Sequence, residues 1–197
     1  MSSKKYLRYS LLSASMFTLL AFAIINHFKV MTYIDNGLFN LLYDYHSPWL
    51  TGVMIGISNI GSPAITSLLL ILLILIYRQS SKQALFLMTF YFGTSALALV
   101  LKLVIHRSRP LYQLLPDSGF SFPSGHSVCA VLLLLMVLFL LKENPTFLSL
   151  CIRCVTFVFT LLVLLSRVYL RDHFPTDILA SLSLDFSSYY LLLAFIG

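Results

Sequence analysis

The stretch FPSGHSVCAVLLLLMVLFLL, from Phe122 to Leu141, places a proline, a serine, a glycine and a histidine directly before an almost uninterrupted apolar run. The run predicts a buried or membrane-embedded helix, and Ser124 predicts its start because a serine can cap the first turn. A titratable group at the edge of a membrane is costly to place there and usually has a function. His126 is therefore the first candidate for a chemical role.

The composition indicates an integral membrane protein. Hydrophobic residues make up 59% of the 197 residues and charged residues only 10%, against about 25% charged residues in an ordinary soluble domain. The mean hydropathy is +0.91. The net charge of +6 does not indicate nucleic-acid binding, because the lysines and arginines are scattered at the ends of apolar segments and form no basic stripe.

Apolar runs of membrane-spanning length divide the chain. A spanning helix needs about 20 mostly apolar residues, and six segments are candidates: 9–28, 57–77, 83–104, 126–141, 151–170 and 177–196. Between the first two, Ile34, Leu38, Leu41, Leu42 and Tyr45 follow helical spacing and predict a short amphipathic helix in the membrane interface. The predicted fold is an all-α bundle of six transmembrane helices plus this interfacial helix, forming one domain over residues 1–197.

The distribution of positive charge predicts the orientation. With a cytoplasmic N-terminus, seven Lys and Arg residues lie inside: Lys4, Lys5, Arg8, Arg78, Lys82, Lys142 and Arg153. The other six lie outside, but three of them, Lys102, Arg109 and Arg167, have a chemical reason to be there. Without these three the distribution is seven against three, so both termini are expected in the cytoplasm and the polar loops on the extracytoplasmic side.

Two polar loops break the apolar pattern, and both fall on the same predicted side. Their polar and special residues are Lys102, His106, Arg107, Arg109, Ser124, Gly125, His126, Arg167, Arg171, His173 and Asp177. Each residue alone has an ordinary explanation, such as a lysine that snorkels to the interface or a serine that caps a helix. Their gathering on one membrane face indicates a functional site.

The residues of these loops suit a phosphate group. Lys102, Arg109 and Arg167 supply positive charge, and arginine forks match phosphate oxygens in pairs. Ser124 and Gly125 open a helix whose first N–H groups can bind an anion, and Gly125 allows close approach of the backbone.

Two histidines and a carboxylate remain for the reaction. His173 can attack phosphorus and form a phosphohistidine, while His126 can protonate the leaving oxygen. Asp177, four positions after His173, can fix the tautomer of the attacking ring. Neither a metal nor a cofactor is expected, because besides Asp177 the loops offer only Asp117 and Asp172 as carboxylates.

These residues resemble the three motifs of the type 2 phosphatidic acid phosphatase superfamily of membrane lipid phosphatases. Residues 102–110 match K-x6-RP, residues 123–126 match PSGH, and residues 166–177 match SR-x5-H-x3-D. The resemblance implies a metal-independent enzyme with the same residue roles. It also implies action at the outer membrane face on phosphatidylglycerophosphate, undecaprenyl diphosphate or phosphatidate. Ser181 departs from the family pattern, in which glycine is frequent at this point of the last helix.

The predicted function is therefore a phosphatase of a membrane lipid phosphate or diphosphate. One alternative is a phosphotransferase that passes the phosphoryl group from His173 to another lipid or a sugar. The other is a non-catalytic lipid-binding or transport protein. The expected partners are the lipid substrate and the membrane lipids, with no nucleic acid and no obligate protein partner.

Four further polar residues have no assigned role: Asp185, His106, Arg107 and Arg171. Asp185 is expected to face polar partners such as Ser183 or Ser188 within the last helix, or alternatively a basic group above it. Arg171 and Asp172 are expected to form a solvent-exposed pair at the rim, or alternatively to select the head group. His106 and Arg107 are expected either at a second phosphate or at the interface.

Overall fold

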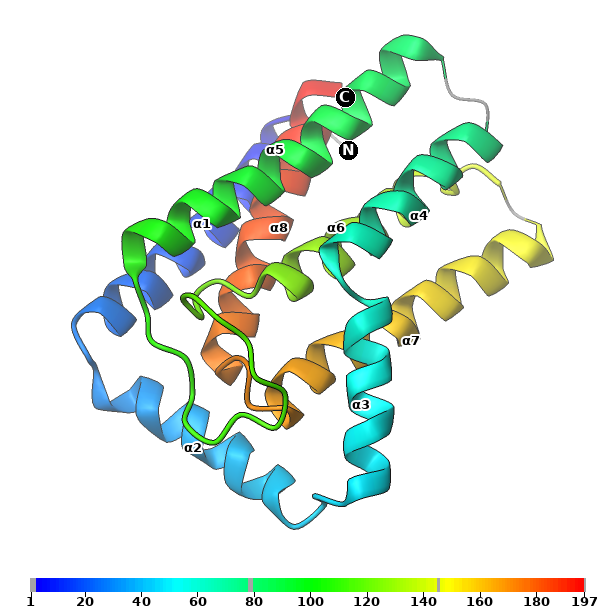
Figure 1. The fold of residues 1–197 in the computed structure, drawn as a ribbon. Helices are drawn as coiled ribbons and strands as arrows, with labels where there is room; N and C mark the ends of the chain where they lie inside the picture. The colour runs from blue at the N-terminus through cyan, green and yellow to red at the C-terminus, as the bar shows by residue number, and fades with distance from the viewer. Residues whose placement is uncertain (1–2, 78–79, 145, 197) are drawn as a thin grey trace.

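The structure, a computed structural model, describes residues 3–77, 80–144 and 146–196, and the described chain is helical without strands. Its helices are α1 (Ser3–Ile25), α2 (Lys29–Tyr43), α3 (Pro48–Ile60), α4 (Pro63–Ile76), α5 (Ser81–Ile105), α6 (Gly125–Leu140), α7 (Phe147–Tyr169) and α8 (Pro175–Ile196). Figure 1 shows the ends of the chain together at one end of the bundle and the α5–α6 loop at the other. Arg78, one of the predicted inner charges, lies outside the described residues.

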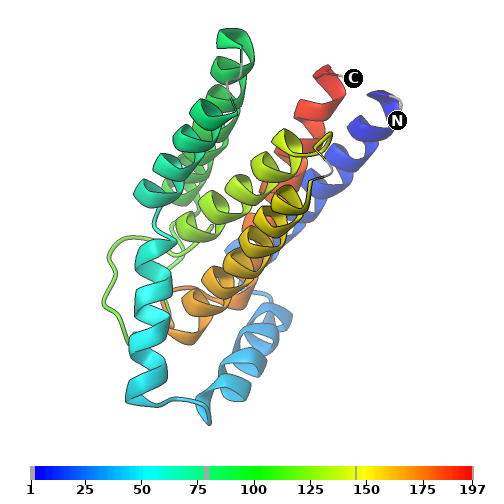
Figure 2. The same cartoon turned by 90° about the vertical axis from the view of Figure 1, so that its right-hand side faces the viewer.

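Helix α6 is the centre of the bundle. It packs against α4, α5, α7 and α8, and Figure 2 shows it enclosed between them. Most of its side chains are buried, from Val128 to Phe139. A helix that is apolar all round has to be surrounded in this way, so the uninterrupted apolar run of the sequence is explained by its central position.

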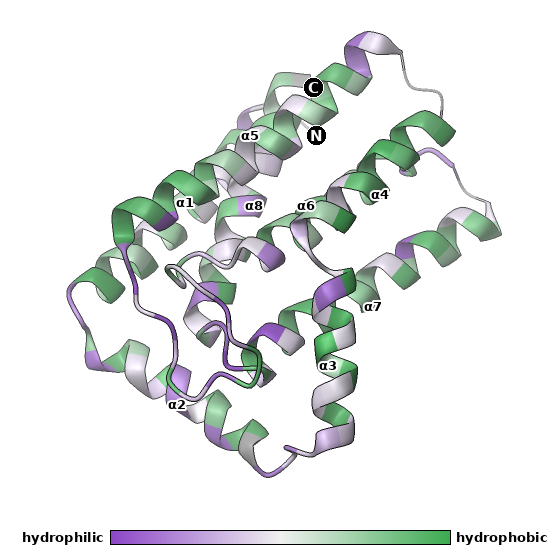
Figure 3. Cartoon of the chain, in the orientation of Figure 1, coloured by the Kyte–Doolittle hydropathy of each residue, from purple (hydrophilic) through white to green (hydrophobic). Residues whose placement is uncertain are grey.

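The outer surfaces of the bundle are apolar, as a membrane protein requires. Figure 3 shows hydrophobic residues along α4, α5 and α7 and polar residues gathered toward the loop end. Four helices, α1, α5, α7 and α8, are long and apolar enough to cross a membrane, and α6 is a shorter apolar helix. The prediction of an all-helical membrane bundle is confirmed, and the count of six spans stays a prediction.

The predicted second span over 57–77 is wrong as a single helix. The chain ends α3 at Ile60 and begins α4 at Pro63, and the two helices meet at an angle of 51°. Pro63 has no N–H to continue a helix, but it is well placed in the first turn of a new one. The region before 57 accordingly holds two helices, α2 and the beginning of α3, where one was predicted.

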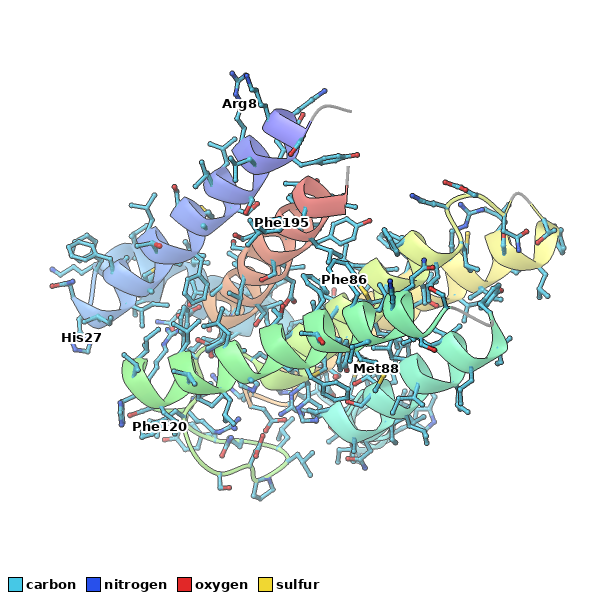
Figure 4. The ribbon with its side chains drawn as sticks, turned by 90° about the horizontal axis from the view of Figure 1, so that it is seen from above. Arg8, His27, Phe86, Met88, Phe120 and Phe195 are labelled. Atoms are coloured by element: carbon cyan, nitrogen blue, oxygen red, sulfur yellow. The ribbon has the colours of Figure 1, made fainter. Side chains whose placement is uncertain are left out.

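Helix α2 forms where the spacing predicted a helix, but Ile34 and Leu41 of the predicted apolar face are exposed, and Tyr45 follows the end of the helix. It buries Asp35 and Phe39 and exposes Val30, Tyr33 and Leu41, and it packs against α7 and α8. Figure 1 shows it lying across the loop end of the bundle. Figure 4 shows His27, just after α1, near this end and Arg8 at the opposite end of α1.

The α3–α4 break depends on a glycine that touches α7. A Cβ added at Gly61 would lie 2.5 Å from Cγ2 of Val163 and 2.8 Å from Cγ1. Gly61→Ala should therefore lower the free energy of unfolding by about 1–3 kcal/mol through overpacking. The matched control is Gly56→Ala within α3, where a Cβ would meet no atom within 4 Å. Thermal unfolding in detergent micelles measures both variants, and equal Tm values would contradict this account of the break.

Candidate active site

The two polar loops meet at one end of the bundle. The N–H of Leu114, in the α5–α6 loop, donates to the carbonyl oxygen of Leu170, just after α7, at 2.9 Å. The α5–α6 loop is itself closed by the N–H of Ser121, which donates to the carbonyl of Arg107 at 2.8 Å. The prediction that both loops lie on the same side is confirmed, and Figure 1 shows them side by side.

His173 lies between a carboxylate and an arginine. Its Nδ1 is 3.5 Å from Oδ2 of Asp177, which is longer than a normal hydrogen bond. Its Nε2 is 3.4 Å from Nη1 of Arg109. Oδ2 of Asp177 also accepts from the N–H of Phe174 at 2.9 Å. The carboxylate therefore faces one ring nitrogen, and the other nitrogen points to a cation that can hold an anion.

Burial keeps the His173 ring neutral. The side chain is 1% exposed. Burial lowers the pKa of His173 to about 4, although the interaction with Asp177 partly offsets this effect. At neutral pH the ring is thus uncharged, which is the form that carries a lone pair for attack on phosphorus.

The three predicted phosphate-binding cations lie in the same site. The ammonium group of Lys102 donates to the carbonyl oxygen of Phe120 at 3.0 Å. Arg109 donates from Nη1 to the carbonyl of Asp172 at 2.9 Å. Arg167 is 1% exposed, with Nη1 at 3.1 Å from Oδ2 of Asp172. Backbone and carboxylate oxygens therefore orient all three cations.

A carboxylate joins two of these cations. Oδ2 of Asp117 lies 3.1 Å from Nη1 of Arg109 and 3.1 Å from Nη2 of Arg167. Burial works to raise the pKa of Asp117, but the two arginines more than offset it, so the pKa lies below its usual value. The side chain is one-third exposed, at 33%. The point where the two arginines converge therefore already accommodates an anionic oxygen.

Ser124 and Gly125 form the start of α6. Ser124 is the N-cap, and its hydroxyl oxygen accepts from the N–H of Ser127 at 3.3 Å. The hydroxyl of Ser127 donates to the same oxygen at 2.8 Å. A Cβ at Gly125 would meet no atom within 4 Å, so the space beside this glycine is open. The capping role of Ser124 is confirmed, and its contact with phosphate stays a prediction.

Ser181 has a clear role despite its departure from the family pattern. Its hydroxyl accepts from the N–H of Ser124 at 3.0 Å and donates to the carbonyl of Asp177 at 2.9 Å. A glycine could make neither bond. Ser181 thus ties the first turn of α8 to the start of α6.

His126 is the second residue of α6 and shares the site with His173. It is close enough to interact electrostatically with His173, Arg167 and Lys102. The two imidazoles, 47 positions apart by their numbers, therefore lie near the same cations. The structure brings together every residue that was predicted to act on phosphate.

Arg107 is placed differently from what was predicted. Its guanidinium lies between two carboxylates, an arrangement that the sequence did not predict. Nη1 is 2.5 Å from Oδ1 of Asp177, and Nη2 is 2.6 Å from Oδ2 of Asp35. The sequence analysis missed Asp35 altogether. The only signal for this residue in the sequence was that it is the single acidic residue of α2.

The expected Arg171–Asp172 rim pair is also wrong. Asp172 is fully buried and pairs with Arg167. Burial raises the pKa of Asp172 to about 6, against the opposing effect of Arg167. Arg171 instead places its guanidinium over the ring of Phe39, 4.8 Å from the centroid. His106 ends α5 in a left-handed conformation and packs on Phe120, with ring centroids 4.3 Å apart.

Asp185 does not find the polar partners that its spacing suggested. It is fully buried within α8, and neither carboxyl oxygen has a hydrogen-bond partner among the described residues. Ser183 donates to the carbonyl of Leu179 instead. Within the same described ranges, no group of three or more His, Cys, Asp or Glu side chains is placed to hold a metal ion.

Comparison with known proteins agrees with this geometry. Residues 82–196 match the model of the PAP2 superfamily. The chain is 35% identical over 190 residues to "Phosphatidylglycerophosphatase B" of Bacillus subtilis (strain 168), covering 91% of this chain and 90% of that protein.

Two solved structures have a similar fold. One is the crystal structure of a transmembrane PAP2-type phosphatidylglycerolphosphate phosphatase from Bacillus subtilis, with a TM-score of 0.82, 31% identity and coverage of 95% of this chain and 96% of that one. The other is LpxE of Aquifex aeolicus, with a TM-score of 0.63, 21% identity and coverage of 83% and 95%. The second likeness concerns the fold alone. Together with the three motifs, the family match and the Bacillus relative show that this chain belongs to the PAP2 superfamily.

Proposed function

We propose that this protein is a membrane lipid phosphatase that removes the terminal phosphate of phosphatidylglycerophosphate through a phosphohistidine on His173. The observation that carries the proposal is the setting of the His173 ring, with Nδ1 toward Asp177 and Nε2 toward Arg109. The names of the Bacillus relative and of the Bacillus crystal structure favour phosphatidylglycerophosphate over other lipid phosphates.

In the first step the substrate phosphate takes the position between Arg109 and Arg167 that Asp117 occupies. Nε2 of His173 attacks phosphorus, and the bond between phosphorus and the lipid oxygen breaks. His126 gives its proton to that oxygen, so the lipid leaves as a neutral alcohol. The cations stabilise the charge that spreads over the phosphoryl oxygens.

In the second step water releases the phosphate. His126, now neutral, takes a proton from the attacking water, a new phosphorus–oxygen bond forms, and the bond between phosphorus and Nε2 breaks. Inorganic phosphate leaves and both imidazoles return to their starting states. Asp177 stabilises the positive charge that His173 carries while it is phosphorylated.

An apolar cavity beside the cations supports a lipid substrate. It has a volume of about 200 Å³ and is lined by Lys102 and Gly125 at its polar end and by Ala98, Leu99 and Val128 along its wall. A phosphate held at Lys102 would thus have its hydrocarbon portion next to apolar side chains. The excess of Lys and Arg in the segments on the same side as the chain ends supports a cytoplasmic position for both termini and an extracytoplasmic site.

The first test removes each imidazole. His173→Ala should abolish both phosphate release and the phosphoenzyme, while His126→Ala should lower kcat by about 10²–10⁴-fold, the usual contribution of a general acid. The assay uses purified protein, labelled phosphatidylglycerophosphate and excess EDTA, with an alkaline quench to preserve phosphohistidine. The labelled product also identifies the acceptor as water or a second lipid.

The matched control is His27→Asn, which replaces an exposed histidine whose left-handed backbone suits asparagine. It should keep the wild-type rate. Full activity of folded His173→Ala, or a wild-type enzyme that is silent in EDTA and restored by magnesium, would refute the mechanism.

The low pKa of His173 predicts that this residue can still attack phosphorus at a pH where an ordinary histidine is protonated. The neutral ring attacks, and it is protonated only as the pH falls through about 4. Protonation of His173 should therefore not lower the rate of phosphoenzyme formation in the range around 6.5, where an ordinary histidine is protonated. Rapid-quench measurements across this range, with Tm recorded at each pH, test the expectation. A loss of the phosphorylation step centred near 6.5 in folded protein would contradict it.

Asp117 should compete with phosphate for the two arginines. Asp117→Asn removes the competing charge, so inorganic phosphate should inhibit the variant about 2–5-fold more strongly, as expected for a partly exposed ion pair. The inhibition constant for phosphate measures this directly, and Asp44→Asn, at an exposed position after α2, is the control. Weaker inhibition of the Asp117 variant would show that this carboxylate assists binding instead of competing.

A further inference from the structure

Both oxygens of the Asp177 carboxylate are engaged, and they face different groups. Oδ2 faces Nδ1 of His173 and accepts from the N–H of Phe174 at 2.9 Å. Oδ1 accepts from Nη1 of Arg107 at 2.5 Å. Because a carboxylate is planar, the position of Oδ1 fixes the position of Oδ2. The bond to Arg107 therefore helps to orient the Asp177 carboxylate toward the imidazole of His173.

Arg107 is itself held from its other side. Its Nη2 donates to Oδ2 of Asp35 at 2.6 Å, and its Nη1 also donates to the hydroxyl of Thr176 at 2.7 Å. Asp35 in turn accepts from the N–H of Thr176 at 3.0 Å and from its hydroxyl at 3.1 Å. The ring of Phe174 covers the guanidinium, 4.0 Å from its centroid.

This network joins three separate parts of the fold. Asp35 comes from α2, Arg107 from the α5–α6 loop, and Thr176 and Asp177 from the first turn of α8. Figure 1 shows these parts converging at the loop end of the bundle. Asp35 is 2% exposed, Thr176 and Asp177 are fully buried, and the side chain of Arg107 is 14% exposed.

Attachment of α2 to the rest of the bundle does not require buried charged side chains. Desolvating a carboxylate and a guanidinium is costly, and an apolar pair of similar volume often stabilises a protein at least as well. Phe39, one turn further along α2, already packs against Val168 and Ile178. The charged network is therefore better explained by what it does to Asp177 than by attachment of the helix.

We propose that Asp35 and Arg107 are positioning residues for the reaction: they hold the Asp177 carboxylate so that Oδ2 stays at Nδ1 of His173 and Nε2 stays free for attack. The inference rests on the proposed function, because it assigns the network to the same nucleophile. It gives α2, a helix far from the three family motifs in sequence, control over the geometry of that nucleophile.

Substitutions at two positions test the network without touching the reacting groups. Thr176→Val removes the hydroxyl that accepts from Arg107 and donates to Asp35 but keeps the shape, and Thr176→Ser restores the hydroxyl. Asp35→Asn keeps the acceptor for the Thr176 N–H but weakens the bond to Arg107. For Asp35→Asn we expect kcat to fall by about 10–100-fold, as when outer partners of a functional group are removed.

The pattern of the kinetic constants separates positioning from folding. Phosphoenzyme formation should slow together with kcat, while KM and the inhibition constant for inorganic phosphate stay at wild-type values because Lys102, Arg109 and Arg167 are unchanged. In Thr176→Val, kcat and the rate of phosphoenzyme formation should also fall, and in Thr176→Ser both should return toward the wild-type values. Asn36→Ala, on an exposed neighbour of Asp35 in α2, should match the wild type.

Two results would overturn the inference. One is a wild-type kcat in folded Asp35→Asn or Thr176→Val, whatever the change in Tm. The other is an equal loss in Thr176→Ser and Thr176→Val, which would exclude the hydroxyl as the link. If Asp35→Asn does not fold, the Thr176 pair decides alone. The proposed function fails separately, through an active His173→Ala, so the two failures are distinguishable.

Discussion

Buried charge has to be paired, and this requirement organises the whole loop end of the molecule. Lys102, Arg107, Arg109 and Arg167 carry four positive charges, and Asp35, Asp117, Asp172 and Asp177 carry four negative ones. An unpaired ion at the edge of an apolar bundle would cost several kcal/mol. The loops, α2 and the start of α8 are therefore held together by the same groups that make the site. Of the four carboxylates, Asp117 is the most exposed and can yield its place to a substrate at the lowest desolvation cost.

The different roles of the arginines follow from this pairing of charges. Arg109 and Arg167 share a partly exposed carboxylate on a loop, so an incoming anion can replace it. Arg107 instead lies between two carboxylates that are almost completely buried, so both ends of its guanidinium are already paired. Similar side chains thus serve different purposes because their partners differ in burial.

The sequence predicted those parts of the molecule that depend on local spacing. The cap at Ser124, the all-apolar α6, and the pairing of His173 with Asp177 four positions later each follow from residues close together in the chain. The break at Gly61 and Pro63 was visible in the sequence but was outweighed there by the apolar run around it. The role of Asp35 and the burial of Asp172 depend on where α2 and the loops pack, and no local pattern carries that information.

The central helix is also a short one. With 16 residues and a rise of 1.5 Å per residue, α6 is about 24 Å long, which is less than the roughly 30 Å thickness of a bilayer's hydrocarbon core. If its far end reaches the opposite boundary, its first turn lies some ångströms below the nearer one. A phosphate ester must then sink toward the catalytic groups, and an ester already anchored by hydrocarbon does so without first leaving bulk water. The depth of the α6 N-terminus would in this way discriminate against soluble phosphate esters before any side chain contacts the head group.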